Sequence, residues 1–355
     1  MTVAQPAPSH MRREIGEVPA VVERILAGAS AELPPVASAI EDRAPRWAMI
    51  AARGTSDHAA VYAQYLIEAH LGLPTGLAKP SITTVYRAPL AWADGMLIAI
   101  SQSGQSPDIV GVVEAARAAG AVTVAITNED PSPLAAAAEW HLRCHAGQER
   151  AVPATKTYVA QLAVVASLVA AVRPDRTLAD GLATLPTVLG ATLDRTEEWL
   201  DGAGRETLDD LAAADRVLLV SRGYNLATAL ELALKLKETC GHFAEAYSTA
   251  DFAHGPLVLA QATVPTIGIR PDGPMGLVMD QTLEAVAGRG RRATVIGGAE
   301  AEAIPGALSL GSSLPEALTP LQFVLPGQLL VEGTARARGL DPDAPVGLGK
   351  VTLTR

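Results

Sequence analysis

Short apolar runs alternate along the chain with longer segments in which apolar residues recur at helical spacing. In the first half, apolar runs at residues 46–52, 95–101 and 122–128 are each followed by a segment long enough for a helix. Apolar runs of this length are typical of buried strands, and strand–helix alternation is typical of a parallel sheet covered by helices. The pattern therefore predicts an α/β fold with a doubly wound, mostly parallel sheet flanked by helices.

The same pattern restarts in the second half of the chain. Residues 216–241 parallel residues 47–72, because each stretch has a strand-like run, an Arg-Gly pair, two polar residues and an alanine-rich helix. Arg53 and Arg222 hold the same position within the two stretches. We infer a tandem duplication of one α/β unit.

Breaks in the pattern set the expected domain boundaries. A short helix is expected at residues 11–28, and a linker rich in Pro, Asp and Gly at residues 172–186. The expected segments are an N-terminal tail and helix at 1–30, a first subdomain at 31–175, a second subdomain at 190–335 and a C-terminal tail at 336–355.

The bulk composition narrows the function classes. A chain of 355 residues is long enough for two domains, and its formal net charge of −10 argues against non-specific nucleic-acid binding, which needs clustered Lys and Arg. Two cysteines imply no disulfide framework and fit a reducing cytoplasm. The first residues lack the apolar core of a signal peptide, and no run approaches the roughly 18 apolar residues of a membrane span. We expect a cytoplasmic protein that binds neither nucleic acid nor membrane.

Polar residues are dense in the sequence SQSGQS, residues 101–106, between an apolar run and a helical segment. Ser106 suits a helix N-cap and Pro107 a first helical position, so the helix would direct free N–H groups and its positive dipole end at this loop. In a parallel sheet such a turn lies at the carboxyl ends of the strands, where ligands bind. The loop adds side-chain donors from Ser101, Gln102, Ser103 and Ser106.

A second polar turn, with Thr55 and Ser56, follows the first strand-like run. Two hydroxyl turns at one edge of a sheet suit a phosphate monoester without any Lys or Arg, whereas ordinary helix capping is the alternative interpretation. The counterpart loop at residues 270–274 has no serine. The phosphate site is therefore expected in the first half only.

Four motifs occur in this order along the chain: ARGTSDHA, SQSGQSPD, ALELALKLKETCGHFAEAY and FAHGPLVL. Together they resemble the SIS (sugar isomerase) family of phosphosugar-binding proteins, in particular the isomerase half of glucosamine-6-phosphate synthase and the stand-alone glucosamine-6-phosphate deaminases. The resemblance implies two tandem SIS subdomains, a homodimer with shared active sites and a small-molecule sugar phosphate as ligand. It matches the phosphate-binding positions to Ser56, Ser101, Gln102, Ser103 and Ser106. Further substrate contacts are expected from Gly54 and Thr55.

The third motif places Glu231, Lys235 and Glu238 on one stripe of a helix. A solvated salt-bridge face is one interpretation, but the apolar residues on the other faces indicate that this helix is buried, and buried charges need a reason. Moving a proton between C1 and C2 of a sugar phosphate needs a carboxylate close to both carbons. The resemblance matches Glu238 to that base, with Glu231 and Lys235 as charged neighbours.

Two more residues are matched by the resemblance to catalytic groups. His254, in the fourth motif, matches a histidine that assists sugar ring opening from the partner subunit, a role that suits a group titrating near neutrality. Lys350 matches a lysine that enters the active site from the C-terminal tail, where its amine would engage a carbonyl by Schiff base or by polarisation. A disordered terminus is the alternative for this tail.

A further loop carries Thr155 and Lys156 just before a helix, and both are candidate substrate contacts. Pro153 and Ala154 replace the Ala and Ser of the synthase-like V-A-S-T-K pattern, which removes one sugar-contacting hydroxyl. This departure favours the deaminase branch. No His/Cys cluster has metal-ligand spacing, so neither a metal nor another cofactor is expected.

The synthases begin with a glutaminase domain whose nucleophilic cysteine follows Met, whereas this chain has Thr2 there and its first cysteine is Cys144. We therefore expect a glucosamine-6-phosphate deaminase that forms fructose 6-phosphate and ammonia. The open alternatives are a galactosamine-6-phosphate deaminase/isomerase, a fructosamine-phosphate deglycase and an isomerase-only synthase-like protein. A non-enzymatic phosphosugar sensor is disfavoured, because Glu238, His254 and Lys350 are all present.

Overall fold

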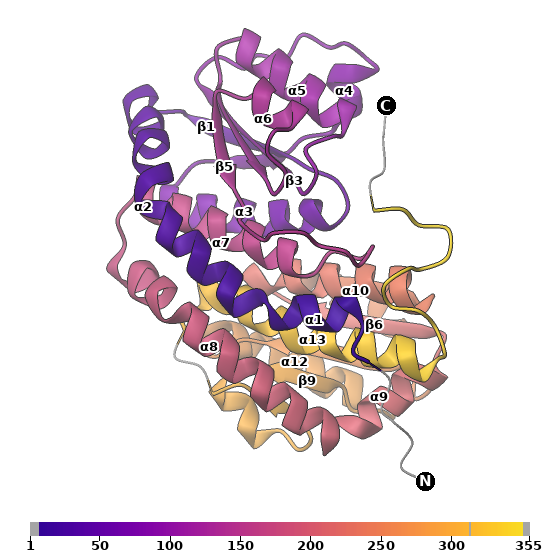
Figure 1. The fold of residues 1–355 in the computed structure, drawn as a ribbon. Helices are drawn as coiled ribbons and strands as arrows, with labels where there is room; N and C mark the ends of the chain where they lie inside the picture. Colours follow the sequence, from indigo (N-terminus) through magenta and orange to yellow (C-terminus); the bar gives the residue numbers. More distant parts are fainter. Residues whose placement is uncertain (1–6, 312–313, 351–355) are drawn as a thin grey trace.

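The computed structural model describes residues 7–311 and 314–350 and contains two five-stranded sheets (Figure 1). The first has the strand order β2-β1-β3-β4-β5, the second β10-β9-β8-β6-β7, and every pairing is parallel. The strands of the first sheet are β1 Trp47–Ala51, β2 Thr75–Leu77, β3 Gly95–Ser101, β4 Val122–Thr127 and β5 Trp140–Arg143. Those of the second are β6 Arg216–Ser221, β7 Phe243–Ser248, β8 Thr266–Arg270, β9 Thr294–Gly297 and β10 Leu308–Ser309.

The predicted fold class is confirmed. Every residue of the central strands β3 and β4 is buried, as is every residue of β8, which explains their continuous apolar runs. Read from opposite edges, the two sheets have the same order, with β1 matching β6 and β3 matching β8. This match supports the inferred duplication.

Helices cover both faces of each sheet. The α-helices are α1 His10–Gly16, α2 Val18–Arg43, α3 Thr55–Leu71, α4 Pro80–Thr84, α5 Pro107–Ala118, α6 Pro133–Ala137, α7 Lys156–Val172, α8 Arg176–Asp201, α9 Gly204–Ala213, α10 Leu226–Cys240, α11 Thr249–Ala253, α12 Pro274–Ala287 and α13 Thr319–Ala337. Short 3-10 helices are η1 Gly223–Asn225, η2 Pro256–Leu259, η3 Ala299–Ala303 and η4 Glu316–Leu318.

The inner helices join the two sheets (Figure 1). Helices α3 and α7 pack together against the first sheet, α10 and α13 pack together against the second, and α3 contacts α10 across the middle. One apolar core runs through all four helices, while smaller clusters lie under α5 and α6 on one outer face and under α11 and α12 on the other. The α3–α10 contact brings the two repeats together beside the site described below.

Residues 11–28 are helical as expected, but they belong to two helices, α1 and α2, and α2 continues to Arg43. The linker expected at residues 172–186 is wrong. Asp175 accepts the N–H groups of Thr177 and Leu178 and caps α8, so only three residues, 173–175, separate α7 from α8. Gly181, which looked like a break, is buried in α8, where a Cβ would lie 2.8 Å from Leu318 Cδ1. The glycine therefore serves close packing rather than a turn.

The domain division itself stays a prediction. The boundaries expected at residues 31 and 190 fall inside α2 and α8. In the part of the chain that the structure describes, no helix is long and apolar enough to cross a membrane.

Candidate active site

A cavity of ≈ 390 Å³ lies at the carboxyl ends of β1 and β3. Four parts of the chain form its walls: the polar turns of the first repeat, the start of α7 with the loop before it, helix α10 of the second repeat, and the C-terminal segment. Among the predicted site residues, the structure brings together in this cavity Gly54, Thr55, Ser56, Ser101, Gln102, Ser103, Ser106, Lys235, Glu238 and Lys350.

The loop of residues 101–106 leads into α5, with Ser106 at the N-cap position and Pro107 as the first helical residue. The Ser106 side chain makes no capping hydrogen bond, so capping does not account for its hydroxyl. Ser101 Oγ accepts the Gly104 N–H at 3.1 Å, which shapes the loop. Gly104 has φ +63°, and a Cβ there would lie 2.4 Å from Ser132 Oγ, so glycine is required.

The turn after β1 supplies the facing wall. Gly54 precedes α3, Thr55 is its first residue, and buried Ser56 accepts a hydrogen bond from Gln161 Nε2 at 2.9 Å. Gln161 belongs to α7 and was missed by the sequence analysis, although it lines the same cavity. The N-termini of α3 and α5 thus meet at one cavity, an arrangement that favours an anion.

The charged stripe of α10 is buried, as its apolar neighbours predict. Lys235 Nζ lies 2.5 Å from Glu238 Oε2 and 3.5 Å from Glu231 Oε1. Burial disfavours the Lys235 ammonium, but the carboxylates of Glu231 and Glu238 outweigh that effect, so the pKa of Lys235 is raised. The lysine therefore stays positively charged beside Glu238.

Glu238 and Glu231 hold different places in this stripe. The Glu238 side chain is 25% exposed and lines the cavity, whereas Glu231 is fully buried and does not. Glu231 accepts a hydrogen bond from Thr55 Oγ1 at 3.2 Å and contacts His58 Nδ1 at 2.8 Å. Glu231 therefore connects α10 to the start of α3 in the first repeat. The sequence analysis missed His58 as a residue of this site.

The C-terminal segment is anchored over the cavity rather than loose. Val152 N–H donates to Asp343 O at 2.8 Å, and the Asp343 carboxylate accepts the N–H groups of His10 and Met11. Lys350 lines the cavity, so the disordered-tail alternative does not hold for residues 338–350.

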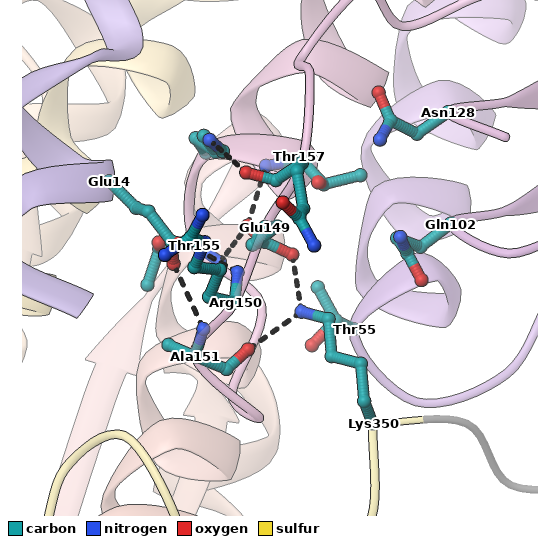
Figure 2. A network of polar contacts seen from close by, with 12 residues as sticks. Glu14, Thr55, Gln102, Asn128, Glu149, Arg150, Ala151, Thr155, Thr157 and Lys350 are labelled. Carbon is teal, nitrogen blue, oxygen red and sulfur yellow. Dashed lines mark hydrogen bonds and ion pairs between the residues drawn. The ribbon is translucent and has the colours of Figure 1, made fainter. Parts of the chain in front are cut away.

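Figure 2 shows the Lys350 amine directed at Glu149, a buried carboxylate that the sequence analysis missed. Lys350 Nζ donates to Glu149 Oε2 and to Ala151 O, both at 2.8 Å. The other oxygen, Glu149 Oε1, accepts the N–H groups of Thr155 and Thr157 at 2.9 and 3.1 Å. Glu149 therefore caps α7 and holds the C-terminal lysine at the same time.

Besides Glu231, three predicted residues do not line the cavity. Thr155 is the N-cap residue of α7, and Lys156 Nζ binds Glu17 Oε2 at 2.6 Å and Gln148 O at 2.7 Å, so Lys156 joins α7 to the N-terminal helices. The α7 residues that line the cavity are instead Thr157, Tyr158 and Gln161. His254 follows α11 in the second repeat, is exposed and lies outside the cavity lining.

The expectation of an anion site without Lys or Arg stays a prediction, but cationic side chains lie in the same cavity. Arg53 lines the cavity together with Lys235 and Lys350. At the end of β8, the counterpart of β3, Arg270 is buried and pairs with Asp280 at 2.7 Å and Glu300 at 3.2 Å. The loop that follows, residues 270–274, has no serine, so the serine loop of the phosphate-site candidate belongs to the first repeat. Within the described residues, no group of His, Cys, Asp and Glu suits a metal ion.

Comparison with known proteins points to one family. The profile described as "SIS domain" matches residues 45–171. A solved structure from Silicibacter pomeroyi, of a protein assigned as a phosphosugar isomerase, is 35% identical with a TM-score of 0.85, covering 95% of this chain and 100% of that chain.

Two further relatives represent the two branches of interest, the aminotransferases and the deaminases. The isomerizing glutamine–fructose-6-phosphate aminotransferase of Methanothermobacter thermautotrophicus is 35% identical over 301 residues, 84% of this chain and 50% of its own length. The chain spans about half the length of the curated relatives it matches. The glucosamine-6-phosphate deaminase of Thermotoga maritima shares the fold, with a TM-score of 0.76 at 20% identity over 98% of this chain and 100% of that one.

Proposed function

Because the chain belongs to the SIS-domain family, we propose that it is an enzyme acting on an amino-sugar phosphate, with the reaction of a glucosamine-6-phosphate deaminase. Glucosamine 6-phosphate and water would give fructose 6-phosphate and ammonia. One observation carries the proposal: a single cavity has hydroxyl turns at two helix N-termini on one side and the Lys235–Glu238 pair on the other. The first wall suits a phosphate and the second suits proton transfer.

The phosphate would lie between the turn of residues 54–56 and the loop of residues 101–106. Backbone N–H groups at the starts of α3 and α5, together with the serine hydroxyls, donate to its oxygens. A phosphate held there places the sugar carbons towards α10, because the hydroxyl turns and α10 line the same cavity from different sides.

Glu238 would move the proton between C1 and C2 of the open-chain sugar. It is the carboxylate of α10 that lines the cavity, and Lys235 Nζ at 2.5 Å keeps it oriented. Lys350 lines the same cavity, where its amine, held by Glu149, would engage a substrate carbonyl by polarisation or by a Schiff base.

The two cysteines of this chain do not suit glutamine hydrolysis. Both Cys144 and Cys240 are buried, and burial raises the pKa of each thiol, that of Cys240 to about 12. Such thiols are poor nucleophiles at neutral pH. Neither cysteine would generate ammonia for the reverse reaction.

We also propose a homodimer in which His254 serves the partner subunit's cavity. His254 is exposed and lies outside the cavity lining, so it does not reach its own subunit's site in the described arrangement. An imidazole supplied by a second copy would shuttle the proton between the anomeric hydroxyl and the ring oxygen during ring opening.

A second candidate is the isomerase half of an aminotransferase, which the curated relatives favour. The two are separated by the reaction of the purified chain. Ammonia release from glucosamine 6-phosphate by the purified chain supports the deaminase, whereas isomerisation of fructose 6-phosphate to its aldose, with no ammonia released from glucosamine 6-phosphate, supports the isomerase half. Galactosamine 6-phosphate and fructosamine 6-phosphate, run in parallel, decide the substrate.

The residue assignment is tested with Glu238→Gln. This variant should keep the fold and substrate binding but lose exchange of the C2 proton with deuterated water, because the amide cannot accept the proton. Glu23→Gln, an exposed change on α2, is the matched control and should keep full exchange. Normal exchange in Glu238→Gln would mean that another residue is the base.

A further inference from the structure

Arg53 links the two walls of the phosphate-site candidate. It follows β1, directly before the turn of residues 54–56, and its side chain lines the cavity with 47% of its surface exposed. Its Nε and Nη2 atoms both donate to Asp108 Oδ2, at 3.0 and 2.8 Å. The guanidinium is therefore fixed at the cavity wall while much of it still faces the cavity.

Asp108 lies in the first turn of α5, the helix that begins at the serine loop. Its side chain is only 2% exposed, and its Oδ1 accepts the N–H of Ile109 at 2.9 Å. A carboxylate beside an anion site repels the anion unless a cation neutralises it. Arg53 supplies that cation. A guanidinium has more N–H donors than the two that donate to Asp108.

The repeat shows that this ion pair accompanies the hydroxyl turns. Arg222 holds the position of Arg53 in the second repeat, and its Nη1 contacts Thr249 Oγ1 at 3.4 Å. It forms no ion pair with a carboxylate in the part of the chain described. Helix α12 begins Pro274-Met275 where α5 begins Pro107-Asp108. Among the described residues, an arginine directly after the first strand therefore pairs with an aspartate at the start of the serine-loop helix in the first repeat, and the equivalent pair is not found in the second.

We propose that Arg53 is a phosphate-binding residue, held in place by Asp108, that donates its remaining N–H groups to the phosphate bound between the two turns. This inference rests on the proposed function and adds a residue to its substrate site. A guanidinium matches phosphate geometry and stays charged at every relevant pH. The site then recognises a phosphate dianion by a fixed positive charge as well as by neutral hydroxyl and backbone donors.

The alternative is that Arg53 only neutralises Asp108. A double-variant series separates the two roles, with the dissociation constant of inorganic phosphate measured by titration calorimetry. Arg53→Met should weaken phosphate binding roughly 10- to 100-fold, the loss expected for a charge-assisted hydrogen bond. Arg53→Met combined with Asp108→Asn should keep at least a roughly 10-fold loss, because the missing donors are not replaced.

If the double variant binds phosphate within about twofold of the wild-type affinity, the proposal is overturned. Neutralising the charge of Asp108 would then be the whole role of Arg53. An unchanged affinity in Arg53→Met would overturn the proposal too. Arg222→Met, the repeat counterpart, is the control and should leave phosphate affinity unchanged. If Arg53→Met unfolds, the double variant carries the test, since it leaves no buried carboxylate unpaired.

Failure of the proposed function gives a different result. Ser103→Ala combined with Ser106→Ala is titrated in the same way. Absence of phosphate binding by the wild-type protein overturns both the proposed function and this inference. Weaker binding in the serine variant with unchanged binding in Arg53→Met overturns the Arg53 assignment alone.

Discussion

The contact between Glu149 and Lys350 makes a quantitative prediction about the C-terminal segment. In Glu149→Gln, the amide oxygen still accepts the N–H groups of Thr155 and Thr157, but the amide nitrogen then faces Lys350 Nζ. Two donors would oppose each other where a carboxylate accepted a hydrogen bond. We expect the lysine to leave this position while the start of α7 stays formed.

The size of the effect follows from burial. The Glu149 carboxylate is fully buried, whereas the Lys350 side chain is 25% exposed. The freed ammonium returns to water, so the cost should fall below the about 3–5 kcal/mol of a stranded buried charge. A charge-assisted hydrogen bond predicts a loss of about 1.5–3 kcal/mol in the free energy of unfolding.

Urea unfolding of wild type, Glu149→Gln, Lys350→Met and the double variant measures this contact directly. We expect a coupling energy of about 1–3 kcal/mol between the two positions. Turnover should fall in both single variants, with no further fall in the double variant, because both changes remove the amine from the cavity. A coupling energy under about 0.5 kcal/mol, with normal turnover in Glu149→Gln, would refute the reasoning.

Two further predictions concern the subunit arrangement and pH. Inactive His254→Ala and Glu238→Gln chains, mixed and refolded, should regain up to about half the wild-type activity per heterodimer, because one site would carry both lesions and the other neither; no recovery would mean that both residues serve one chain's site. Glu316 is half-buried and burial raises its pKa, so its protonated form favours folding below the ordinary value of 4.5, and that contribution is lost as pH rises through the folded-state pKa. Glu316→Gln should therefore be more stable than wild type near about pH 7 but not near about pH 3.5, and urea unfolding that shows no gain at neutral pH would contradict this.

Local sequence patterns predict most of the strands and helices, and also the two polar turns. Strands β3 and β4 are continuous apolar runs because both their faces are buried. Pro107 is the first residue of α5, the position that proline favours. These features depend on neighbours in sequence. The error at residues 172–186 has the same origin, because Gly181 looks like a break until its packing partner, far along the chain, is known.

The charged partners of the site depend on contacts that no local pattern contains. Glu149 and Lys350 are separated by 201 positions, and Lys156 and Glu17 by 139. The sequence therefore predicts that Lys156 contacts the substrate, although its partner is Glu17 in the N-terminal segment. From the sequence, Arg53 stands out only because it aligns with Arg222 of the second repeat. Nothing near Arg53 in the sequence indicates that Asp108 is its partner.

The duplication explains why one cavity holds both a phosphate-site candidate and a proton-transfer candidate. In the register that aligns Arg53 with Arg222, the α10 residues Glu231 and Lys235 correspond to Tyr62 and Leu66 of α3, and all four side chains are buried. Equivalent positions of two related helices are thus apolar in one repeat and charged in the other.

Burying charge costs folding free energy unless each group is paired, and the charges of α10 pair both with one another and with side chains of α3. Thr55 and His58 bind Glu231, which in turn lies beside Lys235. A single repeat would have either the hydroxyl turn or the charged stripe. Because α3 and α10 pack side by side, two diverged copies put a phosphate-site candidate and a proton-transfer candidate into one cavity, and neither repeat would form that cavity alone.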